Sequence, residues 1–230
     1  MSAHTALDTA ILRAQSEENV SVGGEFVRHR LSSRIIHWSV AGFFGVALLS
    51  GLPIWTPVLG WTANLFGGLA VCRVIHPWAG ALFFAASLVM FLHWVSEMVL
   101  LPSERDWLGP KALSYMRHET SDDSEIGKYN GGQKLFFFAV ALGALGLFAS
   151  GLLLWFPMNF SVELREAGIL LHDVTFLLFT VAIVLHIYMG TAAEPGTFRA
   201  MTRGTVSGPW ARLHHPRWVR EMTGGATRRP

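Results

Sequence analysis

Cysteine is almost absent from this sequence. The chain has 230 residues and a single cysteine, Cys72. One thiol cannot close an internal disulfide, and it cannot supply the ligands of an iron–sulfur cluster or of a cysteine zinc site. No C-x-x-C-H motif occurs. Any haem that this chain binds is therefore held without a covalent link, as haem b.

Charged residues are also scarce. They make up 15% of the chain and apolar residues 51%, whereas a soluble domain usually has about 25% charged residues. This composition indicates an integral membrane protein. The first thirty residues are polar and lack the apolar core of a signal peptide, so we expect no cleaved leader there. We expect residues 16–24 to form a flexible lead-in to the first span.

Four apolar segments are long enough to cross a hydrocarbon core about 30 Å thick. Pro77 suits the first turn of the second segment, because the backbone N–H is not needed there. A further apolar segment, 58–72, is too short to span, and we expect it to lie at the interface or to re-enter the membrane. The sequence predicts an all-α integral membrane four-helix bundle. Its spans are residues 35–55, 77–101, 135–155 and 168–190.

Lysine and arginine are distributed unequally between the two ends of these spans. Sixteen of the 18 lie before the first span, between the second and third, or after the fourth. The two opposite connections hold only Arg73 and Arg165. By the positive-inside rule, both termini and the loop 102–134 face the cytoplasm. We therefore expect a polar cytoplasmic segment, a transmembrane domain and a basic cytoplasmic tail, at residues 1–30, 31–192 and 193–230.

Five histidines fall within or at the edges of the spans. A histidine in a helix is more often a hydrogen-bonded core residue than a ligand, but ionisable side chains inside a bilayer are costly and usually functional. His172 and His186 are 14 residues apart, which gives about 21 Å of rise and a difference of some 40° in azimuth along one helix. One helix therefore offers two histidines on one face, one near each membrane surface. The five are His37, His76, His93, His172 and His186.

Each of these two histidines has a counterpart at its own depth. His37, at the cytoplasmic start of the first span, is level with His186, and His76, at the outer start of the second, is level with His172. Zinc would require three or four protein ligands at one point, whereas a haem needs only two axial ligands. The pattern predicts two b haems, an outer one between His76 and His172 and an inner one between His37 and His186. Because both axial positions are filled, we expect electron transfer and not oxygen chemistry.

Other residues near these pairs have a spacing that suits more than one role. Gly80, Gly168 and Gly190 each lie one turn from a paired histidine, which suits either a flat ring beside the backbone or helix packing. We expect His93 and Glu97 to contact a haem propionate or to relay protons. We expect the remaining histidines to be solvated: His4, His29, His118, His214 and His215.

Two other classes of protein remain open at this point. A proton channel or transporter would explain His93 and Glu97, but it would not explain two matched levels of histidines. A passive anchor for a soluble enzyme would need no histidines inside the membrane. An optical spectrum of haem separates both classes from a cytochrome.

Six short motifs together resemble one family. The chain resembles the cytochrome b (gamma) subunit of respiratory, membrane-bound formate dehydrogenases, from about Arg28 to Glu221. The histidine pattern alone would also suit cytochromes of related hydrogenases and thiosulfate reductases, or a small di-haem cytochrome b. The third and last motifs favour the formate dehydrogenase branch. In chain order the motifs are RIIHW (34–38), RVIHPWAG (73–80), GKYNGGQK (127–134), LLHD (170–173), VLHIYMG (184–190) and WARLHHPRW (210–218).

This resemblance implies the same two haem pairs and a quinone site. It places Asn130 and Gln133 at a quinone pocket beside the inner haem, where amide groups at a helix start can hydrogen-bond a quinone carbonyl. An ordinary loop-to-helix turn would give the same N-G-G sequence. No residue of this chain would oxidise formate, so none is expected to be catalytic.

The resemblance also implies partners and a location. The chain would take electrons from a periplasmic iron–sulfur (beta) subunit, and through it from a molybdenum or tungsten catalytic (alpha) subunit. It would deliver these electrons to quinone in a bacterial cytoplasmic (inner) membrane. Membrane lipid would be a further partner, and nucleic acid would not. A higher oligomer of the complex is compatible with this arrangement. Glu194, Pro195 and the segment before Arg28 depart from the family pattern.

Overall fold

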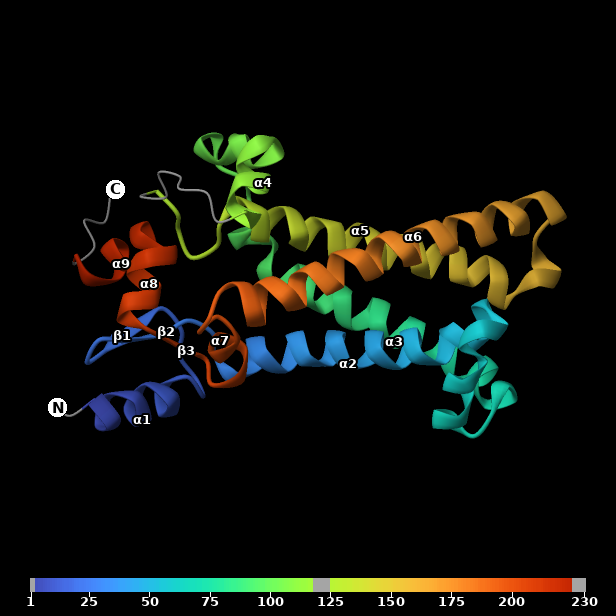
Figure 1. Cartoon of the computed structure of the whole chain (residues 1–230), viewed down its shortest axis with the longest axis horizontal. Helices are drawn as coiled ribbons and strands as arrows, with labels where there is room; N and C mark the ends of the chain where they lie inside the picture. Colours follow the sequence, from blue (N-terminus) through green and yellow to red (C-terminus); the bar gives the residue numbers. More distant parts are fainter. Residues whose placement is uncertain (1–2, 118–124, 225–230) are drawn as a thin grey trace. The chain divides into compact units, whose positions relative to one another are not determined.

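Four long α-helices dominate the fold. The computed structural model describes residues 3–117 and 125–224. Each of the four helices is long and apolar enough to cross a membrane, which confirms the four spans expected from the sequence (Figure 1). The helices are α2 (Leu31–Trp55), α3 (Leu69–Trp94), α5 (Gly131–Trp155) and α6 (Val162–Tyr188).

The second span begins earlier than expected. Pro77 is not in the first turn of α3 but inside it, because the helix already starts at Leu69. Apart from Arg73 and His76, the residues between them are apolar, and the backbone carbonyl that faces a proline inside a membrane helix can be satisfied by other groups. His76 therefore lies two turns inside the helix. The short apolar segment before it forms a helix of its own, η1 (Pro57–Phe66), which ends at Gly67 with a left-handed φ of 88°.

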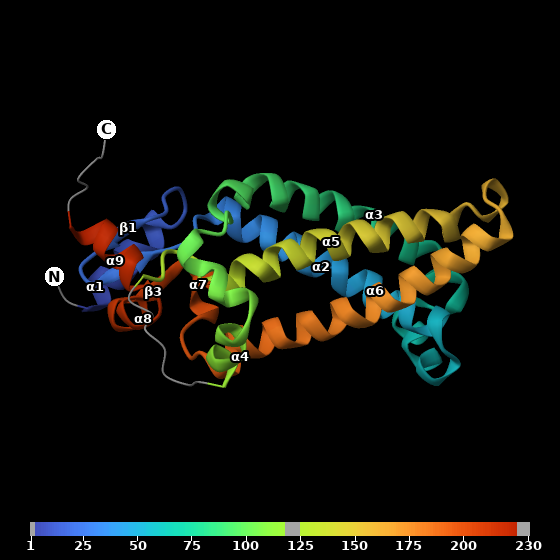
Figure 2. The ribbon, with the colours of Figure 1, turned by 90° about the horizontal axis from the view of Figure 1, so that it is seen from above.

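The chain divides into two units. Unit 1 comprises residues 1–35, 94–137 and 184–230, and unit 2 comprises residues 36–93 and 138–183. Unit 2 holds η1, the short helix η4 (Pro157–Asn159) and most of the four long helices, which lie side by side within it (Figure 2).

Small residues and aromatic rings pack unit 2. A Cβ on Gly143 would collide with the ring of Phe179, so this glycine lets α6 approach α5 closely. The Phe179 ring also meets Phe44 of α2 and Phe83 of α3, with ring centroids 5.0 and 5.6 Å apart. These three buried rings form an apolar core among three of the helices.

The N-terminal segment and the tail fold together in unit 1. Strands β1 (Val20–Val22), β2 (Glu25–Val27) and β3 (Thr205–Ser207) form an antiparallel sheet in that order. Phe26, Val206 and Trp218 are buried in its core. The sheet is surrounded by short helices (Figure 1). These are α1 (Ala3–Arg13), α7 (Phe198–Thr202), α8 (Gly208–His214) and α9 (Pro216–Thr223).

Residues 16–24 are therefore not the flexible lead-in expected from the sequence. Val22 pairs with Glu25, so Gly23 and Gly24 form a two-residue hairpin turn. Both glycines have positive φ, 56° and 90°, as the favoured hairpin turns require. The strands on either side are too short to show a convincing pattern in the sequence.

Unit 1 also holds further short helices, and a buried ion pair connects one of them to the start of α5. Nζ of Lys134 lies 2.7 and 2.9 Å from the two carboxylate oxygens of Glu104 and donates to the Val99 carbonyl at 3.0 Å. Both side chains are buried, and this ion pair attaches the 99–104 segment to α5. The elements are η2 (Val95–Glu97), η3 (Pro102–Leu108), α4 (Pro110–Met116) and the π-helix η5 (Met189–Ala193).

Candidate functional site

His76 of α3 and His172 of α6 face each other in unit 2. Their ring centroids are 6.1 Å apart and their planes are inclined by 77°. A metal–imidazole bond of about 2.0–2.1 Å, plus roughly 1.1 Å from the nitrogen to the ring centre, would place two trans imidazole centres about 6.3 Å apart. The spacing of the two rings therefore fits a pair of axial ligands on one iron.

The Nδ1 atom of each ring already has a hydrogen-bond partner. His76 Nδ1 lies 2.9 Å from the carbonyl oxygen of Ala47, and His172 Nδ1 lies 2.9 Å from the hydroxyl of Ser150. That hydroxyl donates to the carbonyl of Gly146 at 2.6 Å, so it accepts from His172. Such bonds fix the tautomer and the ring orientation of a metal-binding histidine. They leave Nε2 of both rings for a metal.

A glycine lies beside each ring, but only Gly51 is needed to make room for one. A Cβ on Gly51 would lie 2.8 Å from Cε1 of His76, whereas a Cβ on Gly151 would lie 3.6 Å from Cε1 of His172. Both glycines follow a serine in the pattern S-G-L-x-x-W, at residues 50–55 and 150–155. Ser150 and the two glycines are not among the site residues expected from the sequence. This repeat is the signal that could have identified them.

The glycines that were expected to flank a haem differ in their surroundings. A Cβ on Gly80 or Gly190 would meet nothing within 4 Å, so the space beside each is open. A Cβ on Gly168 would lie 3.1 Å from the side chain of Leu153. Gly80 and Gly190 thus fit a flat ring beside the helix, and Gly168 serves the packing of α6 on α5.

The other two candidate ligands each lie against an aromatic ring. The His37 ring in unit 2 meets Trp38 edge to face, with centroids 5.2 Å apart. The His186 ring in unit 1 stacks on Phe136, with centroids 4.6 Å apart and planes inclined by 4°. These contacts orient both imidazoles, and the pairing of His37 with His186 stays a prediction.

Asn130 and Gln133 cap the start of α5 reciprocally. The backbone N–H of Gln133 donates to the side-chain Oδ1 of Asn130 at 2.8 Å, and the backbone N–H of Asn130 donates to the side-chain Oε1 of Gln133 at 3.0 Å. Both side-chain oxygens are therefore occupied. Among the residues that the structure describes, Asn130 Nδ2 and Gln133 Nε2 donate to no other group. Two amide donors are available at the positive end of a helix dipole.

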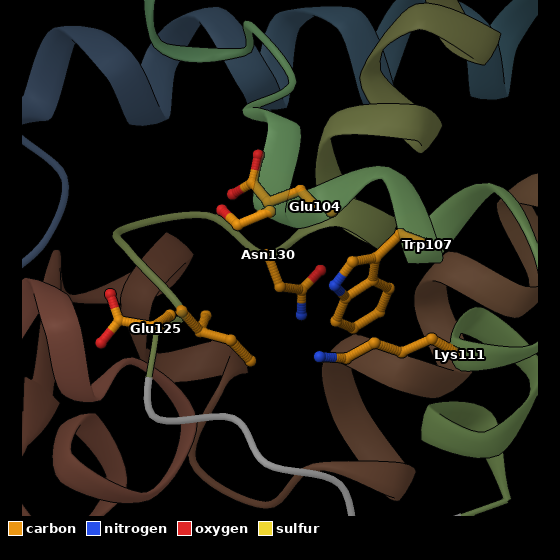
Figure 3. A pocket seen from close by; sticks show the side chains of 8 residues that line it. Glu104, Trp107, Lys111, Glu125 and Asn130 are labelled. Atoms are coloured by element: carbon orange, nitrogen blue, oxygen red, sulfur yellow. The ribbon is translucent and has the colours of Figure 1, made fainter.

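A small pocket lies beside Asn130, within unit 1. Figure 3 shows the Asn130 amide nitrogen directed into it, near Lys111 and Trp107. The pocket encloses about 30 Å³, which is room for roughly two water molecules. The glycines of the N-G-G sequence do not open this space, because a Cβ on Gly131 would collide with the Trp107 ring. The pocket offers a contact point for one carbonyl oxygen, not a place for a whole quinone ring.

Several histidines and acidic residues have other surroundings than expected. His29 and His215 are buried, with 5% and 1% of their surface exposed, instead of solvated. His118 lies outside the described residues. Glu97, expected to act with His93, pairs with Lys128 at 3.0 Å. Oε2 of Glu194 lies 3.3 Å from Nε2 of His214, so Glu194, which departs from the family pattern, has a contact within the tail.

Comparisons with known proteins identify the family of this chain. The model of the prokaryotic cytochrome b561 family matches residues 28–204. The nitrate-inducible formate dehydrogenase cytochrome b556(Fdn) subunit of Escherichia coli strain K12 is 32% identical over 203 residues, which cover 85% of this chain and 91% of that protein. The formate dehydrogenase cytochrome b556 subunit of Haemophilus influenzae is 34% identical over 215 residues, covering 90% and 87%. The chain therefore belongs to the prokaryotic cytochrome b561 family, which includes the cytochrome b556 subunits of formate dehydrogenases.

Proposed function

We propose that this multi-pass membrane cytochrome is the electron-transfer subunit of a formate dehydrogenase complex and reduces quinone. The observation that carries the proposal is the pair His76 and His172, whose rings are 6.1 Å apart with both Nδ1 atoms bonded. The similarity to cytochrome b556 subunits of formate dehydrogenases supports the electron donor. Iron–sulfur and molybdenum or tungsten subunits are the partners that such a donor requires.

The four histidines would hold two b haems. His76 and His172 would be the axial ligands of the outer haem, and His37 and His186 those of the inner one. When bound, the haems supply one-electron transfer with both axial positions filled. The protein contributes the orientation of the imidazoles and the open space beside Gly80 and Gly190.

The two serines of the S-G-L-x-x-W repeats allow a matched test of the outer site. Ser150→Ala removes the hydrogen-bond acceptor of His172 Nδ1. The imidazole would then donate less electron density to a bound iron. We expect the midpoint potential of one haem to rise by about 20–60 mV, from a lost bond of about 0.5–1.5 kcal/mol. Ser50 donates to the Val46 carbonyl at 2.6 Å and, within the part of the chain that the structure describes, forms no hydrogen bond with a histidine. Ser50→Ala should leave both potentials unchanged in the same redox titration, and equal shifts would contradict this role of Ser150.

Quinone would be reduced at Asn130 and Gln133. The available NH₂ groups of both residues are donors, and a quinone carbonyl is an acceptor. The N-terminus of α5 adds a positive partial charge, which favours the negative charge that quinone gains as it is reduced. By the positive-inside rule this helix start, together with both termini, would face the cytoplasm in a bacterial inner membrane, and protons would be taken up there.

The test of this function is a stopped-flow experiment on the purified complex. Formate should reduce the haems rapidly, and added menadione should reoxidise them. Asn130→Ala and Gln133→Ala should slow reoxidation about 5- to 150-fold, as expected for the loss of one hydrogen bond to a polar ligand group. Haem content and the rate of reduction by formate should not change.

A serine variant separates the amide donor from the helix cap. Serine is a good N-cap residue, so Asn130→Ser keeps an oxygen for the backbone N–H of Gln133 and removes only the NH₂ group. We expect haem reoxidation in Asn130→Ser to be as slow as in Asn130→Ala. Unchanged reoxidation in all three variants would show that quinone binds elsewhere, and haems that formate does not reduce would contradict the proposed electron donor.

A further inference from the structure

Arg28 is a buried cation that contacts two distant segments of unit 1. Its side chain is 2% exposed. Nη1 donates to Nε2 of His215 in the tail at 3.0 Å, and Nη2 donates to the carbonyl of Lys128 at 2.6 Å. The guanidinium thus bridges the 127–134 motif and the 210–218 motif, which are more than 75 residues apart in the sequence.

His215 completes this bridge in one defined protonation state. Its Nδ1 lies 2.6 Å from the carbonyl oxygen of Gly127, to which it must donate. Nε2 is then the acceptor for Arg28, which requires a neutral ring. Burial, and secondly the charge of Arg28, lower the pKa of His215 well below 6.5. The ring is therefore neutral at physiological pH, and both of its nitrogens are bonded.

The charge of Arg28 is balanced by aromatic rings. Among the described residues, no carboxylate forms an ion pair with it. Its Cζ lies 5.1 Å from the ring of Trp210 and 5.6 Å from that of Tyr129, distances at which a cation is attracted to a ring face. Burial lowers the pKa of Arg28 to about 10, so the group stays protonated at pH 7.

The bridge reaches the two amides of the candidate quinone site. Nη2 of Arg28 lies 3.5 Å from Oε1 of Gln133, the oxygen that also caps Asn130. Because this oxygen faces the guanidinium, the NH₂ group of Gln133 faces away from it. The tail adds a backbone bond, in which the Arg217 N–H donates to the Ile126 carbonyl at 3.0 Å. A Cβ on Gly127 would collide with the Arg217 side chain, so the contact is a close one.

We propose that Arg28 and His215 form a clasp that holds the 127–133 segment in the conformation in which Asn130 and Gln133 bind quinone. The C-terminal segment is then part of the quinone site, although it contacts quinone only through the motif. Arg28 and His215 are positioning residues. This inference rests on the proposed function, so both are tested with the same quinone and the same haem readout.

His215→Leu tests the clasp, and His215→Gln provides the rescue. Leucine removes both hydrogen bonds, whereas a glutamine carries one donor and one acceptor and can replace the imidazole. We expect His215→Leu to raise the menadione concentration for half-maximal haem reoxidation about 5- to 30-fold, with haem content and reduction by formate unchanged. His215→Gln should restore most of the wild-type value. His214→Leu, which changes the neighbouring histidine bonded to Glu194, should behave like wild type.

Hydrogen–deuterium exchange gives a second readout that does not depend on activity. Peptides that cover residues 125–137 should exchange faster in His215→Leu and return to the wild-type rate in His215→Gln. If His215→Leu does not assemble, Arg28→Lys makes the same test, because it keeps the charge and loses the fork that reaches both His215 and Lys128. The clasp would be overturned if the clasp variants kept the wild-type half-saturating menadione concentration and the wild-type hydrogen–deuterium exchange. The quinone site would still stand if Asn130→Ala reoxidised slowly in the same experiment. Normal reoxidation in Asn130→Ala, Asn130→Ser and Gln133→Ala would refute the quinone site itself.

Discussion

Alanine in place of His76 or His172 is expected to remove the same haem from the chain while the other haem remains. Each histidine would supply one of two axial bonds to one iron, and their ring centroids are 6.1 Å apart. Among the described residues no third histidine ring contacts this pair, so none would replace a lost ligand. The haem content measured by pyridine haemochrome analysis should fall from about two haems per chain to about one in either variant. The two variants should lose the same component of the reduced optical spectrum and of the redox titration.

The second pair provides the comparison. His37→Ala and His186→Ala should remove the other spectral component and spare the one that His76→Ala removes. His93→Ala should retain both haems, because His93, 17 residues after His76 on α3, points about 100° away from it around the helix axis. A haem lost in His93→Ala and kept in His37→Ala would show that the inner pair is wrong. A wild-type content near one haem, or none, would contradict the whole assignment.

Hydropathy was sufficient to predict the four spans, but not where the helices begin. Each span is a run of apolar residues that must satisfy its own backbone hydrogen bonds in lipid, and a helix is the direct solution. Their ends depend on weaker effects. α3 begins at Leu69 and passes through Pro77 because the residues before the proline, mostly apolar apart from Arg73 and His76, already continue the helix. A proline marks a helix start only where nothing before it favours a helix.

The folded ends of the chain depend on contacts that no local pattern reveals. His215 looks solvated in the sequence, since arginine, histidine and proline surround it. The structure buries it because Arg28, 187 residues away, provides a donor for one ring nitrogen and Gly127 an acceptor for the other. Strand β3 similarly pairs with β2 from the opposite end of the chain. Three-residue strands carry too few side chains to be predicted from alternation.

The spacing of two of the histidines could be predicted from helix geometry, whereas their hydrogen-bond support could not. Rise per residue separates His172 and His186 by about 21 Å along one helix from the sequence alone, and both lie on α6. The bond from His172 to Ser150 depends on how closely α5 and α6 pack, which Gly143 and Gly146 determine. The repeated S-G-L-x-x-W pattern is visible in the sequence, but its meaning becomes clear only when each repeat is seen beside a histidine of the next long helix.

Gly51→Ala is expected to disrupt the outer haem site although residue 51 binds no iron. The added Cβ would lie 2.8 Å from Cε1 and 2.9 Å from Nδ1 of His76. An imidazole ring cannot bend away, so His76 must rotate and lose the bond from Nδ1 to the Ala47 carbonyl. Overpacking of this kind costs about 1–3 kcal/mol, which weakens the affinity for the outer haem by roughly 5- to 150-fold. The occupancy of this site should fall accordingly. Haem analysis of the purified variant measures the loss directly.

Gly151→Ala is the matched control, because residue 151 occupies the same place in the second repeat. Its Cβ would lie 3.6 Å from Cε1 of His172, which is an ordinary van der Waals contact. Alanine also favours a helix over glycine by about 1 kcal/mol, so this variant should keep both haems and be no less stable than wild type. The contrast between two identical substitutions isolates the position of the His76 ring as the cause. Equal haem loss in both variants would instead point to a general intolerance of larger residues in these helices, and the specific role of Gly51 would be rejected.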